Sequence, residues 1–185
     1  MAITDFQRSI CQRIAGRRID SGESYVAGGV ALSTQLGSPR LSPDVDLFHD
    51  TRAALAQTWD ADREVLERDF DVEVLRERPT YVEAIVRRGS ESVTMERVCD
   101  SAFRFFPLVE HPDFGLTLHP FDLATNKALA LVGRIEVRDW VDTIHCSNKL
   151  QHLGYLAWTA CGKDPAYSPA LIISEAPPRH SIQRR

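Results

Sequence analysis

The chain lacks an apolar run long enough to cross a membrane, and its N-terminus lacks the charged start and apolar core of a secretory signal peptide. Cysteine is scarce: the four cysteines are scattered and form no C-x-x-C pair, which excludes a zinc ribbon and a disulfide framework. Internal repeats and low-complexity tracts are absent as well. These absences predict a cytoplasmic protein with reduced thiols and no membrane attachment.

A surplus of positive charge is also missing, because 22 Lys and Arg face 26 Asp and Glu. The formal net charge of −4 excludes a basic nucleic-acid coat. Only the C-terminal end is basic, through Lys149, Lys163, Arg179, Arg184 and Arg185. This basic end suits a polyanion, but a solvated surface with a basic tail explains it equally well.

Hydrophobic periodicity indicates the order helix, strand, helix, strand, helix, three strands and then helices. The expected helices cover residues 3–19, 28–36, 51–69, 122–131, 136–149 and 151–160. The expected strands cover residues 24–27, 44–49, 71–75, 81–88 and 92–98, with a late strand at 170–174. The predicted class is α/β (α+β): a small mixed β-sheet core flanked by helices at 1–118, and a helical C-terminal part at 119–185 packed on that core.

Local patterns also assign positions to single side chains. Arg17 continues the helical spacing of the first apolar face, and Asp62 is expected on the polar face of the helix at 51–69. Asp122 is expected to cap the helix that follows it.

Two carboxylates, Asp44 and Asp46, alternate with Val45 and Leu47 in a predicted strand. Side chains alternate along a strand, so both carboxylates are expected on one face while the apolar residues point into the core. Adjacent carboxylates repel unless a cation lies between them, and magnesium is commonly held by one or two carboxylates plus substrate phosphates. The alternative is an ordinary edge strand with solvated aspartates.

A glycine pair, Gly28-Gly29, joins a short strand to an apolar helix shortly before these carboxylates. Glycine lets the backbone approach a phosphate, and the helix N-terminus offers free N–H groups. A tight turn without a ligand is the alternative. The two motifs in this order are more specific than either alone, and together they predict a triphosphate and metal site.

Three further residues are candidates near this site. Glu96 lies in a later strand and is chosen as the third acid, which would help to hold a second metal and accept a proton; an exposed hairpin glutamate is the alternative. Arg40 and Ser42 lie in the link before Asp44, where they are expected to contact the triphosphate. For Arg40, acceptor RNA or plain solvent are the alternatives.

These motifs resemble the DNA polymerase β-like nucleotidyltransferases. A later block, Asp122 to Arg134 followed by Arg138 to Asp142, is similar to one branch of them: the AbiEii/AbiGii family of nucleotidyltransferase toxins, which includes the MenT toxins. The resemblance covers about residues 25–142. It implies that Gly28 and Gly29 contact the triphosphate, that Asp44 and Asp46 bind magnesium, and that Glu96 takes a third position where relatives often have Asp.

In the later block, the resemblance implies that Lys127 reaches the phosphates and that Asp139 completes the lower pocket. Asp142 is expected to orient Lys127 or Arg138. The residues alone allow a second interpretation, because Lys127 lies on an apolar face and needs a counter-charge. Either a phosphate or pairing with Asp139 or Asp142 would supply it.

The resemblance implies a nucleotidyltransferase that uses magnesium, or manganese, to move a nucleotide from a nucleoside triphosphate to an acceptor. Similarity to the MenT group implies the 3′ end of tRNA as acceptor, growth arrest as outcome and an antitoxin protein as partner. Two alternatives stay open. One is nucleotidylation of a protein or of a small molecule such as an antibiotic, and the other is a catalytically silent nucleotide-binding module.

Overall fold

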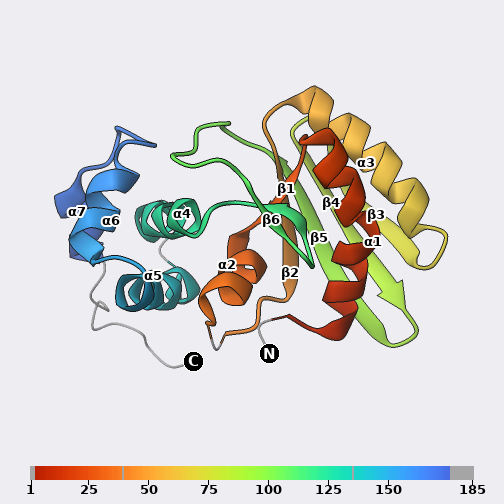
Figure 1. Ribbon diagram of the computed structural model, residues 1–185, viewed down its shortest axis with the longest axis horizontal. Coiled ribbons are helices and arrows are strands. Elements are labelled where there is room, and N and C mark those ends of the chain that lie inside the picture. The colour runs from red at the N-terminus through yellow and green to blue at the C-terminus, as the bar shows by residue number, and fades with distance from the viewer. Residues whose placement is uncertain (1–2, 39, 135, 176–185) are drawn as a thin grey trace. The chain divides into compact units, whose positions relative to one another are not determined.

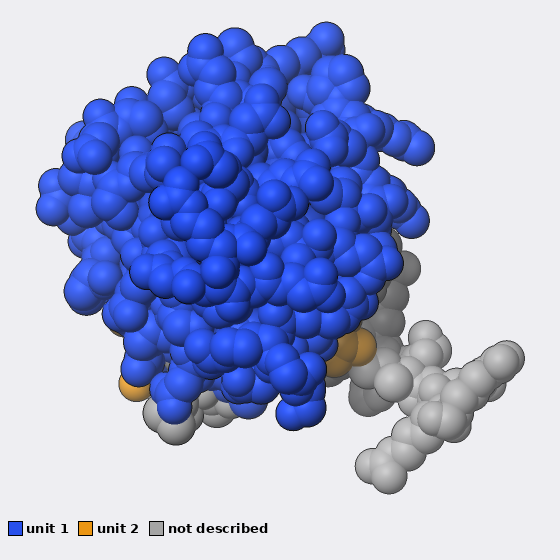
Figure 2. Space-filling model, turned by 90° about the vertical axis from the view of Figure 1, so that its right-hand side faces the viewer, with its two compact units in different colours: residues 1–119 blue, residues 120–185 orange. Residues whose placement is uncertain are grey.

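The computed structural model describes residues 3–38, 40–134 and 136–175 (Figure 1). The expected class is confirmed, because the described residues form a seven-stranded mixed sheet and seven α-helices. The chain divides into two compact units, residues 1–119 and residues 120–185 (Figure 2). No helix within the described ranges is long and apolar enough to span a membrane.

Unit 1 contains the whole sheet, in the strand order β3-β4-β5-β2-β1-β7-β6. The strands are β1 (Tyr25–Ala27), β2 (Asp44–His49), β3 (Asp71–Arg78), β4 (Tyr81–Arg88), β5 (Glu91–Cys99), β6 (Val109–His111) and β7 (Gly115–Thr117). The pairs β2–β5 and β1–β7 are parallel, and the other neighbours are antiparallel. The parallel pairing of β2 with β5 brings together two strands far apart in the sequence.

Three helices belong to unit 1: α1 (Asp5–Ser21), α2 (Gly28–Leu36) and α3 (Arg52–Leu66). Thr4 and Gln7 form a capping box at the start of α1, and Gly22 ends that helix in the left-handed conformation. In Figure 1, α1 and α3 lie beside one another against the sheet. A Cβ at residue 115 would overlap the Ala15 carbonyl, so glycine allows β7 to pack directly on α1.

The sheet has one apolar face and one polar face around the central strands. Val45 and Leu47 of β2 are fully buried, as the alternating pattern predicts. Leu55 and Trp59 of α3 pack against Val82 on this apolar face. Side chains at the alternate positions of β2, β4 and β5 are half-buried on the other face.

Unit 2 consists of α4 (Pro120–Gly133), α5 (Val137–Lys149), α6 (Leu153–Ala160) and α7 (Pro169–Glu175). Small side chains form its core, where Ala128, Ala157 and Ala160 surround Ile172. The alanines let the helices approach closely, and Ile172 fills the remaining space with apolar area.

The structure corrects two predictions about elements. The expected strand at 170–174 is wrong, because this segment is helix α7, begun by Pro169 at its first position and held by burial of Ile172. The hairpin of β6 and β7 was not expected from the sequence. Each of its strands has three residues, too few to display an alternating pattern.

Three predictions about single side chains are also wrong. Arg17 is exposed, and Arg18 is the buried arginine of α1. Asp62 is not on a solvated face, because it is 2% exposed and pairs with buried Arg97. Asp122 does not cap α4, which begins at Pro120; its carboxylate lies 2.8 Å from Lys163 Nζ.

Candidate active site

The three predicted acids of unit 1 meet on two neighbouring strands. Asp44 and Asp46 occupy alternate positions of β2, and Asp46 lies directly opposite Glu96 in the parallel register with β5. All three side chains are half-buried on the polar face of the sheet. Neighbouring strands are about 4.8 Å apart, so the carboxylates of Asp46 and Glu96 belong to one cluster.

The surroundings of Glu96 favour its protonated form. Burial first, and then the charges of Asp46, Asp44 and Glu83, raise the pKa of the Glu96 carboxyl above its usual range. The hydroxyl of Tyr81 donates a hydrogen bond to this carboxylate and opposes the rise in its pKa. Among the described residues, neither Asp44 nor Glu96 forms an ion pair with a lysine or an arginine.

The glycine turn lies against this cluster because β1 and β2 are antiparallel neighbours. Ala27 is opposite Asp46, so the chain turns into α2 beside that carboxylate. Gly28 has φ of 66°, in the left-handed region, and a Cβ on it would overlap the Asp46 carboxylate. The close approach of backbone and carboxylate therefore requires glycine at position 28.

The second glycine brings the link residues Arg40 and Ser42 to the start of α2. A Cβ on Gly29 would come within 2.5 Å of Ser42 Oγ and 2.9 Å of Arg40 Nη2. Gln7 Nε2 donates to the Ser42 carbonyl at 2.7 Å, which fixes the link against α1. Ala27, the N-cap residue of α2, makes no side-chain cap hydrogen bond. The first turn thus offers backbone N–H groups and a positive dipole end to an anion.

The donor set of this cluster fits a magnesium ion that also binds substrate phosphates. Within residues 3–38, 40–134 and 136–175, no group of three or more His, Cys, Asp or Glu side chains is arranged so that it could hold a metal ion. Asp44 and Asp46 supply two carboxylates from one strand. This number is usual for magnesium when phosphate oxygens and water complete an octahedron.

Unit 2 holds a separate charged cluster between α4 and α5. Lys127 Nζ lies 3.1 Å from Asp139 Oδ1 and 3.0 Å from Asp142 Oδ2, and both carboxylates are fully buried. Arg134 Nη2 reaches the same Asp139 oxygen at 2.9 Å. Asp139 Oδ2 is buried and finds no partner among the described residues. The pairing that the sequence left open for Lys127 is therefore present with both aspartates.

Residues 16–157 match the model of a protein family described as the nucleotidyl transferase AbiEii toxin of a type IV toxin–antitoxin system. The match covers more than half of the chain. The chain belongs to the AbiEii family. It is therefore a nucleotidyltransferase of a toxin family, as its sequence motifs implied.

Solved structures agree with the AbiEii fold. JHP933 from Helicobacter pylori aligns with a TM-score of 0.61 at 11% identity, covering 94% of this chain and 90% of that chain. A second H. pylori crystal structure gives 0.61 at 12% identity, covering 92% and 90%. The nucleotidyltransferase toxin MenT4, Rv2826c of Mycobacterium tuberculosis H37Rv, gives 0.54 at 15% identity, covering 88% of this chain and 67% of that chain. A search of curated proteins finds no match.

The AbiEii residues predicted from the sequence form two groups. Unit 1 brings together the glycine turn, the link and the acids, namely Gly28, Gly29, Arg40, Ser42, Asp44, Asp46 and Glu96. Unit 2 brings together Lys127, Asp139 and Asp142. The assigned roles of these residues stay predictions.

Two AbiEii side chains beside the acids were missed, Tyr81 and Glu83 of β4. Glu83 lies opposite Glu96 in the antiparallel register of β4 with β5, and Tyr81 contacts Glu96 from the diagonal position. Their alternation along β4 placed them on one face, but only the strand pairing shows that this face carries the acids.

At least one positive charge near the C-terminal end of the sequence is paired with an acidic side chain of unit 2. Lys163 Nζ contacts the Asp122 carboxylate at 2.8 Å and Asn126 Oδ1 at 2.7 Å. The charge of this lysine is therefore compensated within unit 2. Lys149 is exposed at the last turn of α5. Arg179, Arg184 and Arg185 lie outside the described residues.

Proposed function

We propose that this AbiEii family protein transfers a nucleotide from a nucleoside triphosphate to the 3′ end of tRNA and releases pyrophosphate. The observation that carries the proposal is the assembly of Asp44, Asp46 and Glu96 on one face, directly beside the Gly28–Gly29 turn. Carboxylates gathered on one face of the sheet suit a metal. The adjacent start of α2, which has no side-chain cap, suits the phosphates of a bound nucleotide.

The chain's own residues would bind and orient the triphosphate. Backbone N–H groups at the start of α2 would donate to phosphate oxygens, and Ser42 and Arg40, beside Gly29, would add a hydroxyl and a cation. Asp44 and Asp46 would hold magnesium, or manganese. When bound, the ion neutralises charge on the triphosphate and on the leaving pyrophosphate.

The transfer step balances without another reactant. The acceptor hydroxyl oxygen forms a bond to the α-phosphorus, the bond from that phosphorus to the bridging oxygen of the β-phosphate breaks, and pyrophosphate leaves. Glu96 takes the hydroxyl proton, and its raised pKa brings it closer to the range in which a general base works well at neutral pH. Tyr81 holds this carboxylate in place through its hydrogen bond.

The proposals of tRNA as acceptor and of an antitoxin as partner are supported by the family to which the chain belongs, and not by the geometry of the site. The similarity of the Lys127-to-Asp142 block to the MenT toxins supports tRNA as acceptor. Membership of a type IV toxin–antitoxin family supports growth arrest as outcome and an antitoxin as partner. Lys127 is proposed to contact phosphate as well as its two aspartates. The expected place of action is the cytoplasm, where nucleoside triphosphates and tRNA are present.

The test is a transfer assay. The purified protein is incubated with magnesium, total tRNA, cell lysate and each α-labelled nucleoside triphosphate in turn. Label on tRNA that is lost after EDTA treatment and restored by magnesium or manganese is the expected result. Label on protein or on a small molecule overturns the tRNA assignment, and label on nothing supports a silent module.

The matched variants for this assay are Asp46→Asn and Asp60→Asn. Loss of a metal-holding carboxylate is expected to slow transfer by at least about 100-fold. Asp60 is exposed on α3, and its substitution is expected to leave the rate within about twofold of the wild type. Equal rates for Asp46→Asn and the wild type would contradict the assignment of the site.

A further inference from the structure

A row of apolar side chains lies next to the acids of unit 1, on the same face of the sheet. Phe48 of β2 is opposite Val98 of β5, and Val98 is opposite Tyr81 of β4. All three side chains are half-buried. Each stands two positions along its strand from a member of the acidic row, which consists of Asp46, Glu96 and Glu83. Residues two apart on a strand point the same way, so the two rows run side by side about 6.6 Å apart.

Both ends of the apolar row are defined by neighbouring side chains. On the β1 side, the ring of buried Tyr25 stacks on Phe48, with centroids 6.1 Å apart and an angle of 18° between the rings. On the β4 side, the Tyr81 hydroxyl donates a hydrogen bond to Glu96, which holds the ring beside that acid. Exposed Arg78 of β3 lies opposite Tyr81 and forms no ion pair among the described residues. The row therefore ends in a positive charge at the β3 edge.

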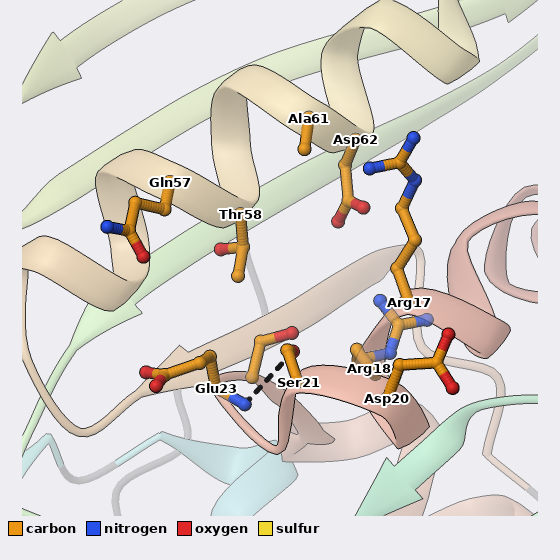
Figure 3. Close-up of a pocket in the computed structure, with 10 residues that line it drawn as sticks. Arg17, Arg18, Asp20, Ser21, Glu23, Gln57, Thr58, Ala61 and Asp62 are labelled. Carbon is orange, nitrogen blue, oxygen red and sulfur yellow. Dashed lines mark hydrogen bonds between the residues drawn. The ribbon is translucent and has the colours of Figure 1, made fainter.

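Helices cover the opposite face of the same strands. Leu55 and Trp59 of α3 pack against Val82, the neighbour of Tyr81 in β4 that points to the other side. The space between α1 and α3 forms a separate pocket, and Figure 3 shows Arg17 extending from α1 towards α3 there. The apolar row is thus part of the face that carries the acids, and Arg17 belongs to the other face.

The order of the strands gives the reaction a direction. Phosphates at the Gly28–Gly29 turn lie on the β1 side of Asp46, whereas Glu96 lies on the β5 side. In phosphoryl transfer the attacking and leaving oxygens are roughly in line with the phosphorus. Because pyrophosphate leaves towards the start of α2, the acceptor hydroxyl arrives from the side of β5 and β4. The last nucleoside of the acceptor then lies over those two strands.

We propose that Val98 and Tyr81 form a platform for the last nucleoside of an acceptor RNA, with its base packed against the Tyr81 ring. The separation of the two rows lets this base lie on the apolar row while its 3′ hydroxyl reaches Glu96. Arg78, at the β3 end, contacts the phosphate that precedes this nucleoside. Every base has an aromatic face, so the platform accepts any terminal base. The inference rests on the proposed function, because it takes RNA as the acceptor.

The experiment measures RNA binding to the full chain without a nucleoside triphosphate, so that no transfer occurs. The probes are a pair of labelled hairpin RNAs with a short single-stranded 3′ end, identical except that one lacks the last base. In fluorescence anisotropy, the wild type is expected to bind the intact end about tenfold more tightly, as base–aromatic stacking predicts. Equal affinity for the two hairpins overturns the proposal.

Variants of Tyr81 separate its ring from its hydroxyl. Tyr81→Leu is expected to reduce the preference for the intact end to less than about twofold, because the aromatic face is gone. Tyr81→Phe keeps the ring, so it is expected to keep the preference, although transfer slows because the hydrogen bond to Glu96 is lost. An unchanged preference in Tyr81→Leu, or its loss in Tyr81→Phe, contradicts stacking on the ring.

Variants of arginine test the path of the RNA strand. Arg78→Gln is expected to weaken both hairpins equally and to lower the salt dependence of binding by about one phosphate contact. Arg17→Gln, exposed on the covered side of the sheet, is the matched control and is expected to bind as the wild type does. Equal effects of the two substitutions overturn the assigned path.

Steady-state transfer separates this inference from the proposed function. Tyr81→Leu is expected to raise the KM for tRNA by about tenfold and to leave the KM for the nucleoside triphosphate within about twofold. The reverse result would place the base of the triphosphate on the platform and overturn the proposal. Label on tRNA together with equal binding of the two hairpins overturns the platform alone. Label on protein, with neither hairpin bound, overturns the proposed function and the platform with it.

Discussion

At the scale of single residues, the candidate site depends on the absence of a side chain at position 28. Gly28 combines a left-handed backbone with direct contact to the Asp46 carboxylate. The glycine therefore serves two requirements at once: it lets the strand turn into α2, and it lets a carboxylate lie against the start of that helix. A substitution at position 28 is therefore expected to have a larger effect than one at a glycine whose added Cβ would meet no other atom.

The variant Gly28→Ala is expected to lose both stability and activity. A non-glycine residue in the left-handed region costs about 1–2 kcal/mol, and the added Cβ must displace Asp46. A displacement of about 1 Å in a catalytic group can slow a reaction by about 100-fold. Urea unfolding and the transfer assay measure the two effects.

Gly16→Ala is the matched control in the same unit. Gly16 lies inside α1 with no atom within 4 Å of an added Cβ, so alanine is expected to stabilise the helix by about 0.5–1 kcal/mol and leave transfer unchanged. The interpretation of the turn fails if Gly28→Ala behaves like Gly16→Ala in both measurements.

At the scale of elements, Lys127 joins α4 to α5. Its ammonium group lies between the fully buried carboxylates of Asp139 and Asp142, both of which belong to α5. Removing one partner of a buried ion pair destabilises the fold by more than the intact pair stabilises it, because the remaining charge stays buried without compensation.

Lys127→Met is therefore expected to lower the free energy of unfolding by about 3–5 kcal/mol. Arg134→Met is the control, because Arg134 contacts the same Asp139 but has a side chain that is 51% exposed. Its loss is expected to cost less than about 1 kcal/mol. Urea unfolding followed by circular dichroism measures both variants, and costs of similar size would contradict a special role for Lys127.

The elements that the sequence predicted best have strong local signals. The bounds of α2, β2 and β4 coincide with the predicted ranges, since a glycine pair begins the first and apolar residues recur at every second position in the other two. The sequence of helix α7 predicts a strand because its isoleucines favour strands, whereas packing of Ile172 among the unit 2 helices decides its conformation.

The candidate site was predictable to the extent that its residues are neighbours in the sequence. Alternation along the strand is enough to predict that Asp44 and Asp46 lie on one face. By contrast, Arg97 and Asp62 are 35 residues apart, and no local pattern indicates that these two charges meet in the core. Tyr81 was missed for a similar reason, because its contact with Glu96 depends on the pairing of β4 with β5.

At the scale of the whole molecule, the two faces of the unit 1 sheet have different electrostatic consequences. One face carries the acids of the candidate site. The other buries Arg18, Arg97, Asp62 and His49 between the sheet and its helices. Burial of His49 lowers its pKa, so its protonation is linked to global unfolding.

His49 gives the clearest case. It is fully buried on β2, and Thr58 Oγ1 lies 2.8 Å from its Nε2. Burial, and then the positive charge of Arg97, lowers the pKa of His49 to about 4. An unfolded histidine titrates near 6.5, so between pH 6.5 and 4 the unfolded chain binds a proton that the folded chain excludes. The stabilising contribution of neutral His49 is complete above pH 6.5 and is lost as the pH falls toward 4.

Acidification from pH 7.5 to 5 is therefore expected to remove about 2 kcal/mol from the free energy of unfolding through His49 alone. The variant His49→Gln keeps a hydrogen-bonding side chain that does not titrate in this range. Its stability is expected to fall by about 2 kcal/mol less than that of the wild type over the same interval. The measurement is urea unfolding at half-unit pH steps for both proteins. Parallel stability curves would show that His49 is protonated as readily in the folded state as in the unfolded state and would contradict its lowered pKa.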